Sequence, residues 1–168
     1  MKKSLATLVF IFAVLFSMAQ SNFSHPGIFV GNVVEDLDKS VKFYTEVIGM
    51  TKTGEFSVDK EKATELGLTN QYQLDVTILK LEDSPNATEW KLMSVGTKAK
   101  HPKQKWMTDD TGMQYITILV NHIDPIIERC KKHNVKILSG IPSGLGDGRS
   151  FILVQDPDGT FIEMIGQR

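Results

Sequence analysis

The chain has 168 residues, of which 41% are hydrophobic and 23% are charged, and its formal net charge is −1. This length and composition fit one globular domain, or two small modules with a common core, and exclude a disordered, collagen-like or coiled-coil chain. A nearly neutral chain lacks the basic surface that nucleic acid requires, so no nucleic-acid partner is expected. The single cysteine, Cys130, excludes an internal disulfide.

Residues 1–19 have the pattern of a secretory signal peptide. Lys2 and Lys3 precede an apolar run from Leu5 to Phe16, which is followed by two small residues two positions apart, Ser17 and Ala19. A helix of this run would be about 18 Å long, against about 30 Å for the hydrocarbon core of a bilayer, so a membrane span is not expected. We therefore expect cleavage after Ala19 and an exported mature protein, periplasmic or secreted, with no membrane association once the signal is removed.

The rest of the chain repeats itself once. With Phe29 placed over Tyr115, an offset of 86 residues, Val34 falls on Val120 and Asp38 on Asp124. Each copy begins as a strand-like apolar run and continues with apolar residues at helical spacing. Three strand-like stretches follow in each copy: Thr51–Val58, Tyr72–Leu81 and Glu89–Val95 in the first, and Val135–Leu138, Ser150–Gln155 and Thr160–Ile165 in the second.

This pattern predicts two βαβββ modules, at residues 27–97 and 113–168. They are joined by a lysine-rich segment at residues 98–112, which we interpret as a linker, with a lid over a pocket as the alternative. A short surface helix is predicted within residues 59–68, inside the first module.

Start and stop residues bound the two predicted main helices. In the first helix, Asp38 is expected to cap the start and Gly49 to supply a left-handed stop. In the second, Asp124 is the expected cap and Pro125 the first helical residue. Cys130 falls on the apolar stripe of the second helix, which predicts a buried apolar side chain rather than a reactive thiol.

Two motifs carry a resemblance to a known superfamily. Val34-x-Asp36-Leu37-x-x-Ser40-x-x-Phe43-Tyr44, followed by Ile48-Gly49-Met50, resembles the opening of a vicinal oxygen chelate module, and Asp156-Pro157-Asp158-Gly159-x-x-x-Glu163 is similar to its closing hairpin. That superfamily includes glyoxalase I, extradiol dioxygenases and bleomycin-resistance proteins. The resemblance implies an α+β fold in which two tandem βαβββ modules form a half-open mixed β-barrel. It does not determine the reaction, because one fold hosts many chemistries.

In metal-using members of the superfamily, side chains at four strand positions hold one divalent ion. These are usually His or Gln on the first strand of each module and Glu on its last strand. The resemblance places these residues at the four positions: Phe29, Lys91, Tyr115 and Glu163. A phenyl ring has no lone pair, an ammonium repels a cation, and a phenol with a pKa of about 10 is a poor ligand. Glu163 alone has the expected type, so we expect no metal and no other cofactor. The alternative is a divalent metal in a non-standard set, for which a shifted strand register would supply His25 and Glu89.

The same four residues, Phe29, Lys91, Tyr115 and Glu163, are expected to line a ligand pocket. We hypothesise that the Lys91 ammonium pairs with Glu163 in place of a metal; the alternative is a Lys91 that reaches outward to solvent.

Three functions follow. The favoured one is metal-free binding of a small molecule in the barrel cavity. The second is an enzyme, a lyase (lactoylglutathione lyase-like), isomerase or dioxygenase, with Glu163 and Tyr115 as candidate catalytic acid–base groups or with an unrecognised metal site. The third is an interaction module whose cavity is filled by its own side chains. The sequence leaves open whether the modules pair within one chain or across a homodimer.

Overall fold

The computed structural model describes residues 23–96, 102–140 and 142–168. The predicted signal peptide lies outside the described residues, as does part of the predicted linker. In the described part of the chain, no helix has the length and apolar character needed to cross a membrane.

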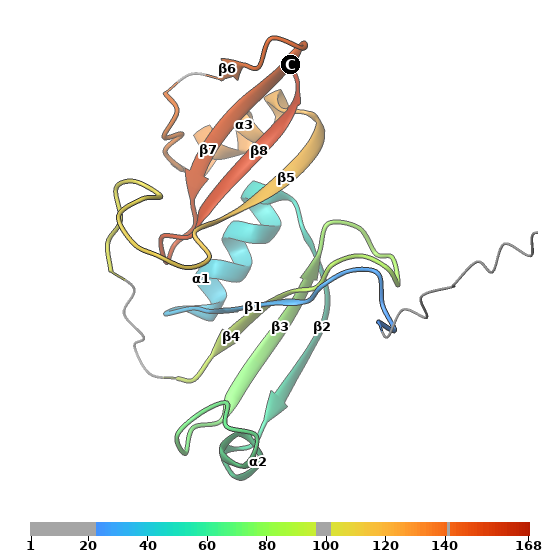
Figure 1. Ribbon diagram of the computed structural model, residues 1–168, viewed down its shortest axis with the longest axis vertical. Coiled ribbons are helices and arrows are strands. Elements are labelled where there is room, and N and C mark those ends of the chain that lie inside the picture. Colours follow the sequence, from blue (N-terminus) through green and yellow to red (C-terminus); the bar gives the residue numbers. More distant parts are fainter. Residues whose placement is uncertain (1–22, 97–101, 141) are drawn as a thin grey trace, which may run out of the picture.

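The chain folds into two modules of the same topology (Figure 1). The first contains β1 (Val30–Val33), α1 (Leu37–Lys42) with its continuation η1 (Phe43–Ile48), β2 (Thr51–Val58), α2 (Lys60–Glu65), β3 (Leu74–Lys80) and β4 (Trp90–Ser94). The second contains β5 (Tyr115–His122), α3 (Asp124–Lys132), β6 (Ser143–Gly144), β7 (Arg149–Gln155) and β8 (Phe161–Gln167).

Each module forms a four-stranded mixed sheet. The strand orders are β1-β4-β3-β2 and β5-β8-β7-β6, and the β1–β4 and β5–β8 pairs are parallel while the others are antiparallel. The predicted fold class, α+β with two tandem βαβββ modules, is therefore confirmed. The short surface helix predicted after β2 is confirmed as α2.

The first helix starts and stops at residues of the expected types. Asp36, not Asp38, is the cap: its carboxylate accepts a hydrogen bond of 3.0 Å from the backbone N–H of Lys39. Gly49 ends the helix in the left-handed conformation with φ at 96°, as predicted. The N–H of Gly49 donates to Tyr44 O, five residues back, so the last turns, η1, are those of a wide π-helix.

Two predictions in the second module are wrong. Ile123, and not Asp124, occupies the cap position, and Asp124 is already the first residue of α3. Val135–Leu138 is not a strand: Val135 and Ile137 pack against the core from an irregular segment. The strand that pairs with the edge of β7 is the two-residue β6, whose Ser143 lies opposite Phe151.

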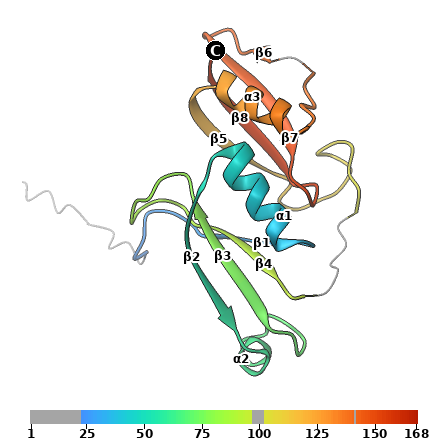
Figure 2. The ribbon, with the colours of Figure 1, turned by 180° about the vertical axis from the view of Figure 1, so that it is seen from behind.

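The two modules have one common core, built from the helix-covered sides of both sheets. Figure 1 and the view from behind in Figure 2 both show α1 between the two sheets. The buried cluster joins Tyr44 and Leu92 of the first module to Ile127 and Ile162 of the second. Cys130 belongs to this cluster with 0% exposure, and burial raises the pKa of its thiol, which confirms a packing role.

An arginine of the second module completes the end of a helix in the first. Arg129 on α3 donates from Nε to Val47 O at 2.7 Å and from Nη2 to Ile48 O at 3.0 Å. These carbonyls belong to the last turn of η1, where backbone acceptors lack partners within the helix. The contact orients α3 against η1 and helps to hold the modules together.

Candidate functional site

The four residues predicted to line a pocket lie on the sheet faces that the helices do not cover. Lys91 in β4 is flanked by the buried Trp90 and Leu92, and Glu163 in β8 by the buried Ile162 and Met164. Because successive side chains of a strand point to opposite faces, Lys91 and Glu163 point away from the core. Phe29, just before β1, and Tyr115, at the start of β5, are 49% and 50% exposed.

On the first sheet, Lys91 is held by partners from its own module. Its Nζ lies 3.2 Å from Glu89 Oε2 and 4.9 Å from the centre of the Phe29 ring. The other oxygen of Glu89 lies 3.7 Å from Lys80 Nζ. The Glu89 carboxylate therefore sits between two ammonium groups, and the charge of Lys91 is balanced locally.

On the second sheet, Glu163 accepts a hydrogen bond from the Thr117 hydroxyl. The parallel register of β5 and β8 places Thr117, and not Tyr115, directly beside Glu163. Sequence reasoning missed Thr117; the available signal was strand alternation, which puts Thr117 on the same face as Tyr115. The hypothesised Lys91–Glu163 ion pair is not formed, because each side chain has a partner within its own module.

One chain brings these residues together in two pairs rather than in a single group of four. Phe29 and Lys91 share the open face of the first sheet, and Tyr115 and Glu163 share that of the second. The helices occupy the space between the sheets (Figures 1 and 2). The open faces also carry Val33, 49% exposed, and Leu119, 70% exposed. Exposed apolar side chains that gather on one face are typical of a surface that another molecule covers.

The donors at the family's metal positions do not fit a divalent ion. Only Glu163 offers an anionic oxygen, and the carboxylate of the neighbouring Glu89 is already shared by two lysines. His25 is 3.0 Å from Pro85 O through Nε2 and 3.1 Å from Gly27 O through Nδ1. These backbone contacts, with Pro85 first and Gly27 second, raise the pKa of His25. The backbone N–H of Gly27 also lies 3.0 Å from Nδ1, so both ring nitrogens are already engaged by backbone groups. Within residues 23–96, 102–140 and 142–168, no three His, Cys, Asp or Glu residues are grouped as a metal site requires.

The two motifs that carry the family resemblance meet at the boundary between the modules. Tyr44 in η1 donates its hydroxyl to Asp156 Oδ2 at 2.8 Å, and Asn32 Nδ2 donates to the same oxygen at 3.3 Å. Asp156 Oδ1 accepts from the backbone N–H groups of Asp158 and Thr160, each at 2.9 Å. The next acid of the turn, Asp158, accepts from the Ser40 hydroxyl at 3.1 Å, so the β7–β8 turn is docked on α1 and η1.

Burial determines the protonation of this network. Asp156 is 6% exposed and Tyr44 is 0% exposed. Loss of solvation raises the pKa of Asp156 despite its four hydrogen-bond donors. Burial, followed by the charge of Asp156, raises the pKa of Tyr44 well above its ordinary value, so the phenol remains a donor. Ser40, Tyr44, Asp156 and Asp158 thus form a structural connection between the modules. Glu163, the last residue of the second motif, lies instead on an open sheet face.

Comparison with known proteins agrees with this fold. The family model described as the Glyoxalase/Bleomycin resistance protein/Dioxygenase superfamily matches residues 28–164. No curated protein has a significantly similar sequence.

Solved structures show the same architecture at low sequence identity. A glyoxalase family protein of Bacillus cereus has a TM-score of 0.72 at 18% identity, over 89% of this chain and 98% of that one. The trypanothione-dependent glyoxalase I of Leishmania major has a TM-score of 0.59 at 24% identity, over 83% and 84% of the two chains. Glyoxalase I of Zea mays has a TM-score of 0.62 at 23% identity, over 82% of this chain and 43% of that one. The match of the family model to residues 28–164 shows that the chain belongs to the Glyoxalase/Bleomycin resistance protein/Dioxygenase superfamily.

Proposed function

We propose that the protein binds a small, largely apolar molecule between open sheet faces, without a divalent metal, and that two copies of the chain complete the binding hollow. The observation that carries this proposal is the pair of open faces. Each has an exposed ring beside a charged side chain: Phe29 beside Lys91 on one, and Tyr115 on the same face as Glu163 on the other. Such a mixture of rings with few polar groups is typical of small-molecule sites.

A second copy supplies the missing half of the hollow. Within one chain the core holds the two sheets with their helix-covered sides together. A twofold axis that sets the first module of one copy against the second module of its partner would bring both pairs of residues together, twice per dimer. Covering Val33, which is 49% exposed, or Leu119, which is 70% exposed, would contribute about 1 kcal/mol per side chain to association.

The dimer is tested by a charge placed on an open face. Leu119→Glu puts a carboxylate on the open face of β5, the edge strand of the second sheet, where burying it without a partner is unfavourable. We expect the wild-type mature chain to sediment as a dimer and Leu119→Glu to sediment as a monomer. Leu66→Glu is the matched control, because Leu66 is 55% exposed at the end of α2, away from both faces. A monomeric wild type would contradict the shared hollow.

Ligand binding is tested in the same preparation by thermal unfolding. We expect 2-naphthol, taken as a neutral aromatic probe, to raise the melting temperature of the wild type and not of Glu163→Ala, whereas Ni²⁺ and Zn²⁺ leave both unchanged. At a probe concentration of 100 times Kd, binding stabilises the folded state by about 2.7 kcal/mol. Glu61→Ala, on α2, is the control. A metal-dependent rise that Glu163→Ala abolishes would instead favour a metal-dependent enzyme.

We also propose that the protein is exported. The support is the basic, apolar and small-residue pattern of residues 2–19. Expression of the full chain in a secretion-competent host should yield a mature protein that begins at Gln20, as measured by intact mass. A chain that keeps Met1 through Ala19 would contradict export.

A further inference from the structure

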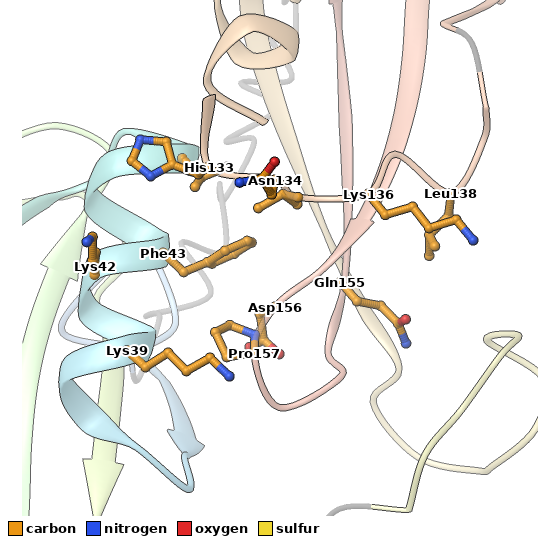
Figure 3. Close-up of a pocket in the computed structure, with 12 residues that line it drawn as sticks. Lys39, Lys42, Phe43, His133, Asn134, Lys136, Leu138, Gln155, Asp156 and Pro157 are labelled. Atoms are coloured by element: carbon orange, nitrogen blue, oxygen red, sulfur yellow. The ribbon is translucent and has the colours of Figure 1, made fainter. Parts of the chain in front are cut away.

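A cleft lies at the boundary between the modules, and none of the four residues of the proposed hollow lines it. Its volume is about 480 Å³. One wall is α1 and η1, the second is the segment after α3, and the third is the turn between β7 and β8 (Figure 3). Neither family motif assigns a ligand to this cleft, and the proposed hollow does not include it.

The cleft has an excess of positive charge. Lys39 and Lys42 line it from α1 and Lys136 from the segment after α3. Within the part of the chain that the structure describes, none of these ammonium groups lies within ion-pair distance of a carboxylate. His133, which also lines the cleft, is 3.4 Å from Glu46.

The one acidic lining residue does not neutralise these lysines. Asp156 is 6% exposed, and both of its oxygens already accept hydrogen bonds, two from side chains and two from backbone N–H groups. The lysines that line the cleft therefore have no counter-charge there, and their positive potential attracts an anion.

The middle of the cleft is apolar. Phe43 points into it from η1 (Figure 3), and its side chain is 7% exposed. Val47 lies beside Phe43 on the same helix, and Val135 and Leu138 line the opposite wall. A ligand that fits both parts has a flat or apolar body next to Phe43 and an anionic group next to the lysines.

We propose that this cleft binds a small organic anion, an aromatic or apolar molecule that carries a phosphate or carboxylate, and that the ligand bridges the two modules. The ligand would contact both modules, because residues of both line the cleft. Lys39, Lys42 and Phe43 belong to the first module, and Lys136 and Gln155 belong to the second. The site is independent of the proposed hollow, because no residue is common to both.

The test uses phenyl phosphate as the probe, with ¹H–¹⁵N NMR titration to locate it. We expect the backbone signals of Lys39, Phe43, Val135 and Lys136 to shift, and those of Tyr115 and Glu163 to stay unchanged. Inorganic phosphate alone should bind at least ten-fold more weakly than phenyl phosphate, because it lacks the ring. Equal affinities would overturn the apolar part of the proposal.

Single substitutions then separate a built site from general charge attraction. Lys42→Ala and Lys136→Ala should each weaken phenyl phosphate binding about five-fold, as expected for one partly exposed ion pair. Both lysines are exposed, so their removal should leave folding unchanged. Lys60→Ala, on α2, removes the same charge far from the cleft and should leave the affinity unchanged. Equal weakening by Lys60→Ala, shifts confined to the open sheet faces, or no binding would overturn the proposal.

Discussion

Replacing Asp156 by alanine is expected to lower the free energy of unfolding by about 3 kcal/mol, measured by urea denaturation. The substitution removes the acceptor for four donors, of which the Tyr44 hydroxyl is the most deeply buried. A buried donor left without a partner costs about 1–3 kcal/mol. The two backbone N–H groups lie in a turn where water can replace part of the loss, so Tyr44 accounts for most of the effect.

The matched control is Asp83→Ala. Asp83 is an exposed aspartate between β3 and β4 and takes part in no hydrogen bond or ion pair within the described ranges. Its removal should change the free energy of unfolding by less than about 0.5 kcal/mol. Similar losses in the two variants would mean that the contact between Tyr44 and Asp156 does not hold the modules together.

Asp156→Asn removes the charge of the Asp156 carboxylate but keeps a side chain of nearly the same shape. The asparagine side chain still accepts hydrogen bonds from the turn and can donate to the Tyr44 oxygen. Burial raises the folded-state pKa of Asp156, so its favourable contribution is complete below the unfolded pKa and is lost as pH rises through the folded value. The stability advantage of the wild type over Asp156→Asn should therefore be larger at pH 3 than at pH 7. An advantage that grows with pH would contradict a raised pKa.

Local features of the fold were predictable because short-range chemistry determines them. Gly49 takes the positive φ that ends a helix, and the Asp156–Gly159 turn closes a hairpin by the usual turn chemistry. The apolar residues Val135, Ile137 and Leu138 misled the strand prediction, because an irregular segment that packs on a core needs apolar residues too. The true edge strand, β6, has two residues, and its backbone pairing leaves no signal in side-chain type.

The arrangement of the site depends on contacts between residues distant in sequence. The Tyr44–Asp156 hydrogen bond joins residues 112 positions apart, and no local pattern predicts that the two family motifs touch. The side on which the modules pack together likewise decides whether Phe29 and Glu163 share a hollow within one chain. Strand alternation predicted only the sheet face on which each of the site residues lies. The register of the parallel strand pair then placed Thr117 next to Glu163.

A methyl group added at Gly166 is expected to lower the free energy of unfolding by about 3 kcal/mol, at the upper end of the usual cost of overpacking. The cause is the close approach of two parallel strands. Leu119 pairs with Ile165 and His122 with Gln167, so two residues of β5 lie opposite Gly166 alone, as in a β-bulge. A Cβ at Gly166 would overlap the carbonyl oxygen of Val120 and lie 2.7 Å from its Cγ2 atom.

Gly144→Ala provides the control for Gly166→Ala. Gly144 lies in β6 of the same sheet, and a Cβ there would meet no atom within 4 Å. Urea denaturation should therefore show a change of less than about 0.5 kcal/mol for Gly144→Ala. A small effect at Gly166 would mean that β5 can move away from β8. Because β5 carries Tyr115 and Thr117, such a strand could not hold the second open face in place, and the proposed hollow would lose the rigid wall on which it depends.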